Sequence, residues 1–267
     1  MLKYRLFTSV IGVPLVIYIT YLGGWIYSLS ILTVVLIAAY ELFKFAENEK
    51  INYSVFFSLF LNTAIVAFTF INKRIYILPL LIIFIITSSV YKALFQDEID
   101  KLLEKVSLEV FSSLYISLPL SYFLLIRNLP NGEKFVILLL GIVWLNDSFA
   151  YFIGKKMGKT KINTHISPNK TMEGAIGGFL GGLLSGLIFA YFFHFNLVSV
   201  FFLSLIIITI SQLGDLVESA FKREVGIKDA GNIIPGHGGV LDRFDGLIFA
   251  TPVYYYLIIL VFNKLGG

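Results

Sequence analysis

Nine long apolar runs constrain this chain more than any other feature of its sequence. They cover about residues 6–24, 26–43, 52–71, 75–91, 107–126, 134–154, 174–193, 197–221 and 244–262. A helix needs about 20 mostly apolar residues to cross a bilayer. The runs are continuous and lack the period-two alternation that is typical of a transmembrane β-barrel. We therefore predict an all-α, polytopic integral membrane protein with about nine transmembrane helices.

The composition supports this class. Hydrophobic residues make up 57% of the chain and charged residues 14%, whereas a soluble domain carries roughly 25% charged residues. The first run follows MLKYR and has the position of a signal peptide, but it lacks a convincing cleavage site, so we expect a retained first span. The chain contains no cysteine, which excludes disulfides and thiolate chemistry.

The distribution of Lys and Arg predicts the orientation in the membrane, because cytoplasmic loops carry an excess of both. With the N-terminus in the cytoplasm, all but five of the 21 Lys and Arg residues lie on the cytoplasmic side, and the five are Lys73, Arg74, Arg127, Lys134 and Lys264. We expect a multi-pass protein of the cell (inner) membrane with a cytoplasmic N-terminus and an external C-terminus. The polar loops 155–173 and 222–243 would then face the cytoplasm and line a polar cavity on that side.

We expect two regions along the chain. Residues 1–130 would form about five N-terminal membrane spans, and residues 131–267 a C-terminal catalytic region of about four spans with a polar loop. Residues 92–106 carry Leu and Ile on one face and predict a short amphipathic helix that lies on the membrane surface as a connector. The clusters that suit chemistry all occur in the second region.

The first cluster is Asn146-Asp147-Ser148-Phe149-Ala150-Tyr151, near the cytoplasmic end of the sixth run. Asp147 and Tyr151 are four residues apart and share a helix face. An ionisable residue inside a membrane is a functional hypothesis by default. The alternative is that Asp147 merely caps or bonds a neighbouring helix.

The second cluster is the loop GKKMGKTKINTHISPNKTMEG, residues 154–174. Its lysines suit an anion, although the first four are explained equally well by topology or by contact with anionic lipids. Ser167, Lys170, Thr171 and Glu173 stand where the chain enters the seventh run, and the free backbone N–H groups at a helix start favour phosphate. That run, GAIGGFLGGLLSG, contains small residues that permit close helix packing.

The third cluster begins on the eighth run and ends at the start of the ninth. One face of the eighth run carries residues spaced by four, three and four positions: Ser211, Asp215, Glu218 and Lys222. Asp242 and Asp245 are three residues apart at the start of the ninth run. Carboxylates that converge from different helices provide the oxygen ligands that Mg²⁺ prefers. Between them, PGHGG provides flexible backbone that can approach a phosphate closely.

Together the clusters supply acids and bases but no activated nucleophile. The sequence has no HExxH motif, no Walker loop and three histidines, His165, His194 and His237. Phosphoryl or nucleotidyl transfer fits, because it relies on positioning and on charge neutralisation by metal ions, Lys and Arg. An attacking phosphate, with a second pKa of about 6, needs no general base at pH 7. His237 suits either a functional role or a structural one in its glycine turn.

In order and spacing, one set of residues resembles the signature of the phosphatidate cytidylyltransferases, also called CDP-diacylglycerol synthases. The set comprises Ser219 to Arg223, Lys228-Asp229, Gly231, Pro235, His237-Gly238-Gly239 and Asp242 to Asp245. The segments NDSFAY and SPNKTMEG resemble two further motifs of the family, NDxxAY and SPKKTxEG. Asn169 stands where the family often has Lys, which leaves Lys170 as the main base there. The motifs cover about residues 146–246, and residues 1–130 agree in hydropathy alone.

The resemblance implies that CTP and phosphatidic acid react to give CDP-diacylglycerol and pyrophosphate, with one or two Mg²⁺ ions as cofactor. It implies metal ligands at Asp215 and Asp242, with Asp147 and Asp245 as further ligands or their support. The implied catalytic residues are Asp215, Asp242, Asp245, Lys222, Arg223 and Lys228. The implied substrate-binding residues are Asn146, Ser167, Lys170, Thr171, Glu173, Ser219, Asp229, His237, Gly238, Gly239 and Arg243. The implied partners are CTP, phosphatidic acid, the lipid bilayer and a second copy of the chain in a homodimer, with no nucleic acid.

A different class also has to be weighed, that of an ion-coupled membrane transporter with intramembrane carboxylates. Such a transporter predicts internal repeats and charges at the middle of its spans. The sequence shows no repeat of two halves, and its charges are predicted to lie near one membrane face. We therefore expect an enzyme.

Overall fold

The computed structural model describes residues 2–48, 54–95, 101–163, 165–231, 233 and 238–262. It confirms the all-α class. The helices are α1 (Leu2–Leu22), α2 (Gly24–Asn48), α3 (Val55–Phe70), α4 (Ile77–Phe95), α5 (Leu102–Ser112), α6 (Leu118–Arg127), α7 (Gly132–Met157), α8 (Met172–Phe193), α9 (Leu197–Glu224) and α10 (Leu241–Phe262). A short 3₁₀ turn, η1 (Arg74–Tyr76), precedes α4, and a π-helical turn, η2 (Ser113–Ser117), joins α5 to α6.

Each predicted apolar run coincides with one helical segment, when α5, η2 and α6 are taken as a single helix. Within the described residues, seven helical segments are long and apolar enough to cross a membrane. The apolar parts of the other two, Val10–Leu22 in α1 and Val55–Phe70 in α3, are shorter. The chain is therefore a multi-pass membrane protein, and the count of nine spans stays a prediction.

The chain divides into two compact units, which are described separately. The first comprises Met1–Leu125 with Val225–Arg243, and the second comprises Ile126–Glu224 with Phe244–Gly267. The segment that links α9 to α10 therefore belongs with the N-terminal helices. The predicted division near residue 130 rests on where the polar clusters lie, and it stays a prediction.

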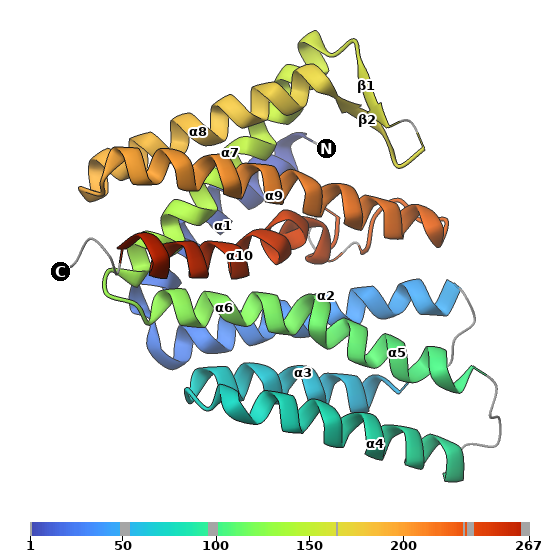
Figure 1. The fold of residues 1–267 in the computed structure, drawn as a ribbon. Coiled ribbons are helices and arrows are strands. Elements are labelled where there is room, and N and C mark those ends of the chain that lie inside the picture. The colour runs from blue at the N-terminus through green and yellow to red at the C-terminus, as the bar shows by residue number, and fades with distance from the viewer. Residues whose placement is uncertain are drawn as a thin grey trace. The chain divides into compact units, whose positions relative to one another are not determined.

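In the first unit, α3 and α4 pack side by side as an antiparallel pair (Figure 1). Leu61, Ile65 and Phe84 form part of an apolar core between them. The same unit also buries charge: the Lys92 ammonium lies 2.6 Å from Glu109 Oε2, and both side chains are fully shielded from solvent. Ser88 donates a further hydrogen bond of 2.8 Å to that oxygen. Pairing offsets the cost of removing the two charges from water.

The prediction of a surface-lying connector helix over residues 92–106 is wrong at both of its ends. Residues 92–95 are the last turn of α4, and residues 102–106 are the first turn of α5. Lys92, Lys105 and Val106 are buried. The amphipathic pattern arises because the end of one helix and the start of the next each turn an apolar face inward; residues 96–100 lie outside the described part.

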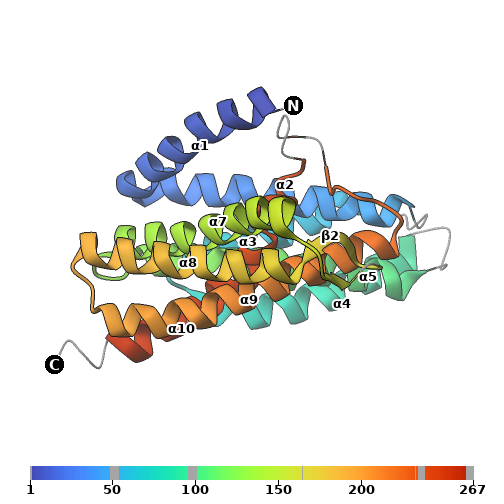
Figure 2. The same cartoon turned by 90° about the horizontal axis from the view of Figure 1, so that it is seen from above.

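In the second unit, α7, α8 and α9 lie next to one another, with α8 against both α7 and α9 (Figures 1 and 2). Glycines allow the close approach of α8 to α7: a Cβ atom at Gly178 would lie 2.7 Å from the Asn146 carbonyl oxygen, and one at Gly181 would overlap the Phe149 ring. This confirms the prediction that the small residues of α8 permit close packing.

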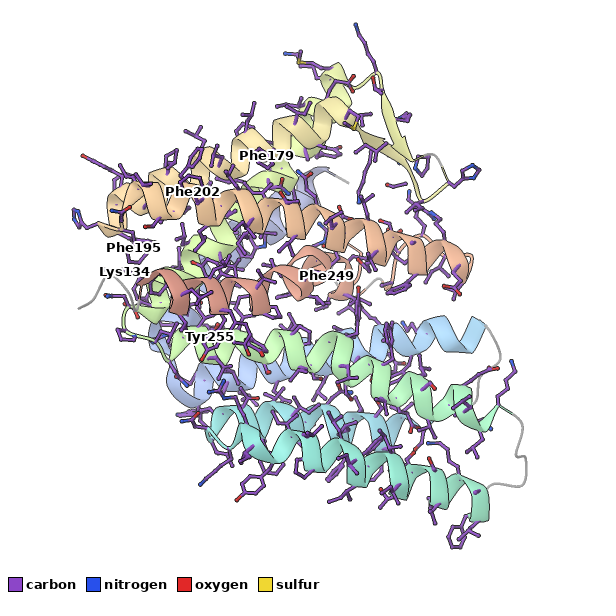
Figure 3. All side chains as sticks on the ribbon, in the orientation of Figure 1. Lys134, Phe179, Phe195, Phe202, Phe249 and Tyr255 are labelled. Carbon is purple, nitrogen blue, oxygen red and sulfur yellow. The ribbon has the colours of Figure 1, made fainter. Side chains whose placement is uncertain are left out.

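The helices of the second unit are also fastened at one end. The Tyr254 hydroxyl of α10 donates a hydrogen bond of 2.9 Å to the Phe135 carbonyl of α7. The Phe135 ring stacks on Phe195, which lies between α8 and α9, with centroids 4.7 Å apart. Figure 3 shows Phe195 beside Lys134 at this end, while Phe249 lies nearer the start of α10. The polar clusters occupy the opposite ends of α7 and α9.

A two-stranded sheet interrupts the helical architecture between α7 and α8. Strands β1 (Lys161–Asn163) and β2 (Ser167–Thr171) pair antiparallel, with Lys161 opposite Thr171 and Asn163 opposite Ser167. Thr171 ends β2 and caps α8, because its hydroxyl accepts a hydrogen bond of 3.2 Å from the Gly174 N–H. A cap of this kind satisfies one of the free donors at a helix start. The strand pair was not predicted from the sequence.

Candidate active site

An amide network centred on buried Asn146 joins the three neighbouring helices of the second unit. Asn146 of α7 is 1% exposed. Its Oδ1 accepts a hydrogen bond of 2.8 Å from Gln212 Nε2 of α9, which also donates to the Ala175 carbonyl of α8. The Asn146 amide nitrogen donates a hydrogen bond of 2.9 Å to Asp147 Oδ1. The network therefore fixes the position of Asp147 through its neighbour.

Lys170 and Asp215 were both predicted to be site residues, and the structure brings them into contact. Lys170 Nζ lies 2.7 Å from Asp215 Oδ1. Lys170 comes from β2 and Asp215 from α9, so the pair joins the strand motif to the helix. The Ser219 hydroxyl, one turn further along α9, lies 3.5 Å from the same carboxylate oxygen. Three predicted residues from two motifs thus share one location.

Carboxylates gather around this location. Asp245, near the start of α10, lies within electrostatic range of three others, those of Asp215, Glu218 and Asp147. Glu218 is fully buried, and Lys222 Nζ lies 3.2 Å from its Oε1 one turn along α9. Helix packing makes the approach possible: a Cβ at Gly214 would lie 2.9 Å from the Asp245 carbonyl oxygen. Negative charge concentrated in this way is costly inside a membrane unless cations pair with it.

The structure leaves the magnesium prediction untested. Among the described residues, no group of three or more Asp, Glu or His side chains is arranged to hold a metal ion. Mg²⁺ needs only one or two protein carboxylates, because water and substrate phosphates complete its coordination. The oxygen donors of Asp147, Asp215 and Asp245 therefore fit the chemistry of the ion.

The strand pair and the start of α8 are held by polar contacts of their own. Glu173 reaches back to the chain after α7, where its Oε2 accepts hydrogen bonds from the Lys159 N–H at 3.0 Å and the Thr160 N–H at 3.2 Å. Arg223 Nε at the end of α9 donates a hydrogen bond of 3.2 Å to the Ile166 carbonyl. Ser167 is half-buried at the start of β2. In the structure Glu173 serves to shape this loop.

The signature loop, residues 225–240, belongs to the first unit with the start of α10. Asp242 closes it, because its carboxylate accepts hydrogen bonds from the Ala230 N–H at 3.0 Å and the Gly239 N–H at 2.8 Å. Gly238 has a φ of +84°, and a Cβ atom there would lie 2.9 Å from Asp242 Oδ2, so this position requires glycine. The exposed members of the predicted set here are Lys228, Asp229 and Arg243. His237 lies outside the described residues.

Two residues of these networks were not identified from the sequence. Gln212 is an uncharged residue in an apolar run, and no sequence pattern relates it to Asn146, which lies 66 positions away. Glu41 of α2 is 0% exposed, and its Oε2 accepts a hydrogen bond of 2.8 Å from the Leu241 N–H. A signal for Glu41 did exist: it is an acid within the second apolar run, and such residues are functional hypotheses by default.

Comparison with known proteins identifies relatives along most of the chain. A family model described as "Cytidylyltransferase family" matches residues 3–261. The phosphatidate cytidylyltransferase of Bacillus subtilis (strain 168) is 39% identical over 160 residues, which is 59% of this chain and 60% of that protein. Those of Staphylococcus haemolyticus (strain JCSC1435) and Staphylococcus aureus (strain COL) are each 42% identical over 153 residues, which is 56% of this chain and 58% of each relative. The matched region thus spans less than two thirds of these relatives.

Proposed function

Because this chain belongs to the cytidylyltransferase family, we propose that it transfers a cytidylyl group from CTP to phosphatidic acid and releases pyrophosphate. The relatives that bear the name phosphatidate cytidylyltransferase support the choice of acceptor. The observation that supports the site most strongly is the 2.7 Å ion pair between Lys170 and Asp215. It brings a base of the SPNKTMEG motif to an acid of α9, among the other carboxylates of the second unit.

In the proposed reaction, an oxygen of the lipid phosphate forms a bond to the α-phosphorus of CTP. The bond from that phosphorus to the oxygen bridging to the β-phosphate breaks, and pyrophosphate leaves with the electron pair. Lys170, Lys222 and Arg223 would neutralise the negative charge on the phosphates, which is the main task of a protein in this chemistry. The attacking phosphate is mostly deprotonated at pH 7, so no side chain has to remove a proton from it.

Magnesium is part of the proposal. The oxygen atoms of Asp147, Asp215 and Asp245 in the second unit would hold it, in keeping with the preference of the ion for oxygen ligands. Asp242 stays a ligand predicted from the family resemblance. When bound, the ion would supply Lewis-acid neutralisation of phosphate charge. Asp215 has a further role that does not depend on the ion, because it holds the ammonium group of Lys170 in place.

Turnover of the purified protein in detergent tests the function. Phosphatidic acid and each nucleoside triphosphate in turn would be supplied, and pyrophosphate followed. We expect release with CTP that requires both the lipid and Mg²⁺, and that stops on chelation and returns with added Mg²⁺. Asp215→Asn should lower turnover by at least about 10²-fold, whereas Glu224→Gln, an exposed change at the end of the same helix, should leave it within about twofold.

Two results would overturn parts of this proposal. Folded protein that releases no pyrophosphate with any nucleotide would exclude the reaction. Normal turnover in Asp215→Asn would exclude its assignment as a ligand. The alternative of an ion-coupled transporter gains no support from the family or from the relatives.

The cellular arrangement is also proposed. The active site would face the cytoplasm, where CTP is found, in a chain of the cell (inner) membrane with its N-terminus inside and its C-terminus outside. The acyl chains of phosphatidic acid would enter from the bilayer between helices. A homodimer is expected from the family resemblance, and the mass of the detergent-solubilised protein by light scattering measures it.

A further inference from the structure

We propose that Glu41 of α2 is a positioning residue that holds the signature loop in the shape the reaction needs. This inference rests on the proposed function, because it assigns Glu41 a role in the same active site. Glu41 lies in an apolar run that carries none of the motifs of the resemblance. Its carboxylate acts on the loop and on Asp242, without contact to the reacting atoms.

The burial and the hydrogen bonding of Glu41 show that its carboxylate faces the loop. The side chain is 0% exposed. Its Oε2 accepts a hydrogen bond of 2.8 Å from the Leu241 N–H. Leu241 is the first residue of α10, whose first N–H groups have no partner within the helix. A carboxylate from a distant helix therefore caps α10, where negative charge is also favoured by the helix dipole.

Two glycines of the loop are explained by the space that Glu41 occupies. A Cβ atom at Gly239 would lie 2.5 Å from Glu41 Oε2, and one at Gly231 would overlap Glu41 Oε1. Neither glycine has a positive φ, so their torsion angles do not require glycine. Both are buried. The carboxylate fills the volume in which two side chains would otherwise stand, and the backbone at Gly231 and at Gly239 lies against it.

The same loop holds Asp242, and this links Glu41 to the proposed chemistry. The N–H groups of Ala230 and Gly239 donate to the Asp242 carboxylate. Gly239 packs directly against the Glu41 carboxylate. Gly231 does so as well, and Ala230 precedes it in the chain. If the Glu41 side chain is removed, the backbone that carries the Ala230 and Gly239 N–H donors loses the carboxylate that packs against it. We therefore expect a loss of activity that arises through Asp242.

A purely structural role for Glu41 has to be separated from this one. A cap on α10 alone would change stability, and it would not make the effect of a loop glycine depend on residue 41. The test is a double-mutant cycle of Glu41→Ala with Gly239→Ala, measured as kcat/KM for CTP. Gly239→Ala should be harmful because its Cβ meets the carboxylate. In the Glu41→Ala background the same change should cost at least about tenfold less activity, since residues in contact couple.

Conservative variants and a control complete the design. Glu41→Gln keeps the size and an acceptor for the Leu241 N–H, and it should retain activity within about threefold, whereas Glu41→Ala should lose about 10- to 100-fold, mainly in kcat. Glu41→Asp withdraws the carboxylate by one methylene and replaces Glu41→Ala if that variant does not fold. Glu109→Gln alters a second buried carboxylate of the first unit, which pairs with Lys92 on α4, and should not couple to Gly239→Ala.

Proteolysis provides a readout that is independent of turnover. Lys228 is an exposed trypsin site within the loop, and loss of Glu41 should speed cleavage there by about tenfold or more, because local opening governs the rate. Wild-type protein without CTP turnover would overturn the proposed function, while this readout still reports on Glu41. Normal turnover in wild type, together with equal cleavage rates and additive effects at positions 41 and 239, would overturn the inference.

Discussion

The ion pair between Lys170 and Asp215 is partly exposed, with 26% of the lysine side chain and 34% of the aspartate side chain accessible. Pairs in such surroundings add about 0–1 kcal/mol to stability. The main effect of the pair is therefore to position the charges of Lys170 and Asp215, and its contribution to the free energy of folding is small. Asn146 shows the opposite balance, because it is buried and its Oδ1 depends on a hydrogen bond from the half-buried Gln212.

Replacing Lys170 should separate these two effects. Lys170→Met should lower kcat/KM by about 10²- to 10³-fold, the usual loss when one stabilising cationic or donor group is removed. The free energy of unfolding should change by no more than about 1 kcal/mol. Lys161→Met is the matched control, since Lys161 is exposed on the paired strand, and it should keep both quantities near wild type. Steady-state kinetics and thermal unfolding measure them; a large loss of stability with normal kinetics contradicts the prediction.

Replacing Gln212 should reduce stability more than activity. Gln212→Leu leaves Asn146 Oδ1 buried without the donor it has now, and an unsatisfied buried group costs about 1–3 kcal/mol. We expect a loss of that size in the free energy of unfolding, with a smaller loss of activity through displaced Asp147. Thr209→Ala, an exposed change on the same helix, should be neutral. Denaturant titration in detergent checks both variants, and equal stabilities would rule out the bridging role.

Among the helices, α7 and α8 depend on each other most closely. Their glycine-lined contact places the Asn146 carbonyl near Gly178 and the Phe149 ring near Gly181. Tight packing of this kind fixes one relative position for two helices, because a packed interior adjusts little to added volume. The cap at Thr171 and the strand pair start α8 at a defined point. These elements together give the motifs on α7 and β2 a fixed spacing.

A single methyl group tests that contact. Gly178→Ala should reduce the free energy of unfolding by about 1–3 kcal/mol, because the Cβ overpacks the helix contact. Gly12→Ala is the matched control: Gly12 also lies in a helix, and a Cβ there meets nothing within 4 Å, so the change should be neutral or stabilise by up to about 1 kcal/mol. Thermal unfolding of both variants measures the difference. If Gly12→Ala were the more harmful change, the contact would not be the cause.

For the molecule as a whole, the orientation in the membrane is the main open prediction. The chain has no native cysteine, so single cysteines can be introduced without background. A cysteine at exposed Thr160, in the loop before β1, should react with a membrane-impermeant maleimide only when the inner face is accessible. A cysteine at exposed Asn131, before α7, should react in intact cells. The reverse labelling pattern would invert the predicted topology.

The sequence predicted helices better than contacts. Long apolar runs determine where helices form in a membrane, and the run at 134–154 became α7 at Gly132–Met157. The family resemblance named both Lys170 and Asp215 as site residues, but it did not predict the ion pair between them. The strand pair at Lys161–Thr171 was missed because its residues are polar and its strands are too short to show alternation. The surface helix at 92–106 was wrong because periodicity does not tell whether an apolar face meets lipid headgroups or other helices.

Residues that act through distant partners were the least predictable. Glu41 and Leu241 are 200 positions apart, and no local pattern connects them. Gln212 is likewise 66 positions from Asn146. Their roles depend on which helices become neighbours, and that arrangement is a property of the folded chain.

The separation of Glu41 from its cap has a consequence for the time course of synthesis. Leu241 leaves the ribosome 200 residues after Glu41, which at about 5–20 residues per second is a delay of about 10–40 s. During that interval α2 is already complete, yet its carboxylate has no α10 to cap and no loop to support. The hydrogen bond between Glu41 and the Leu241 N–H can form only after the start of α10 has been made. Nascent chains that end before α10 would therefore contain every preceding motif and still lack the hydrogen bond from the Leu241 N–H to Glu41.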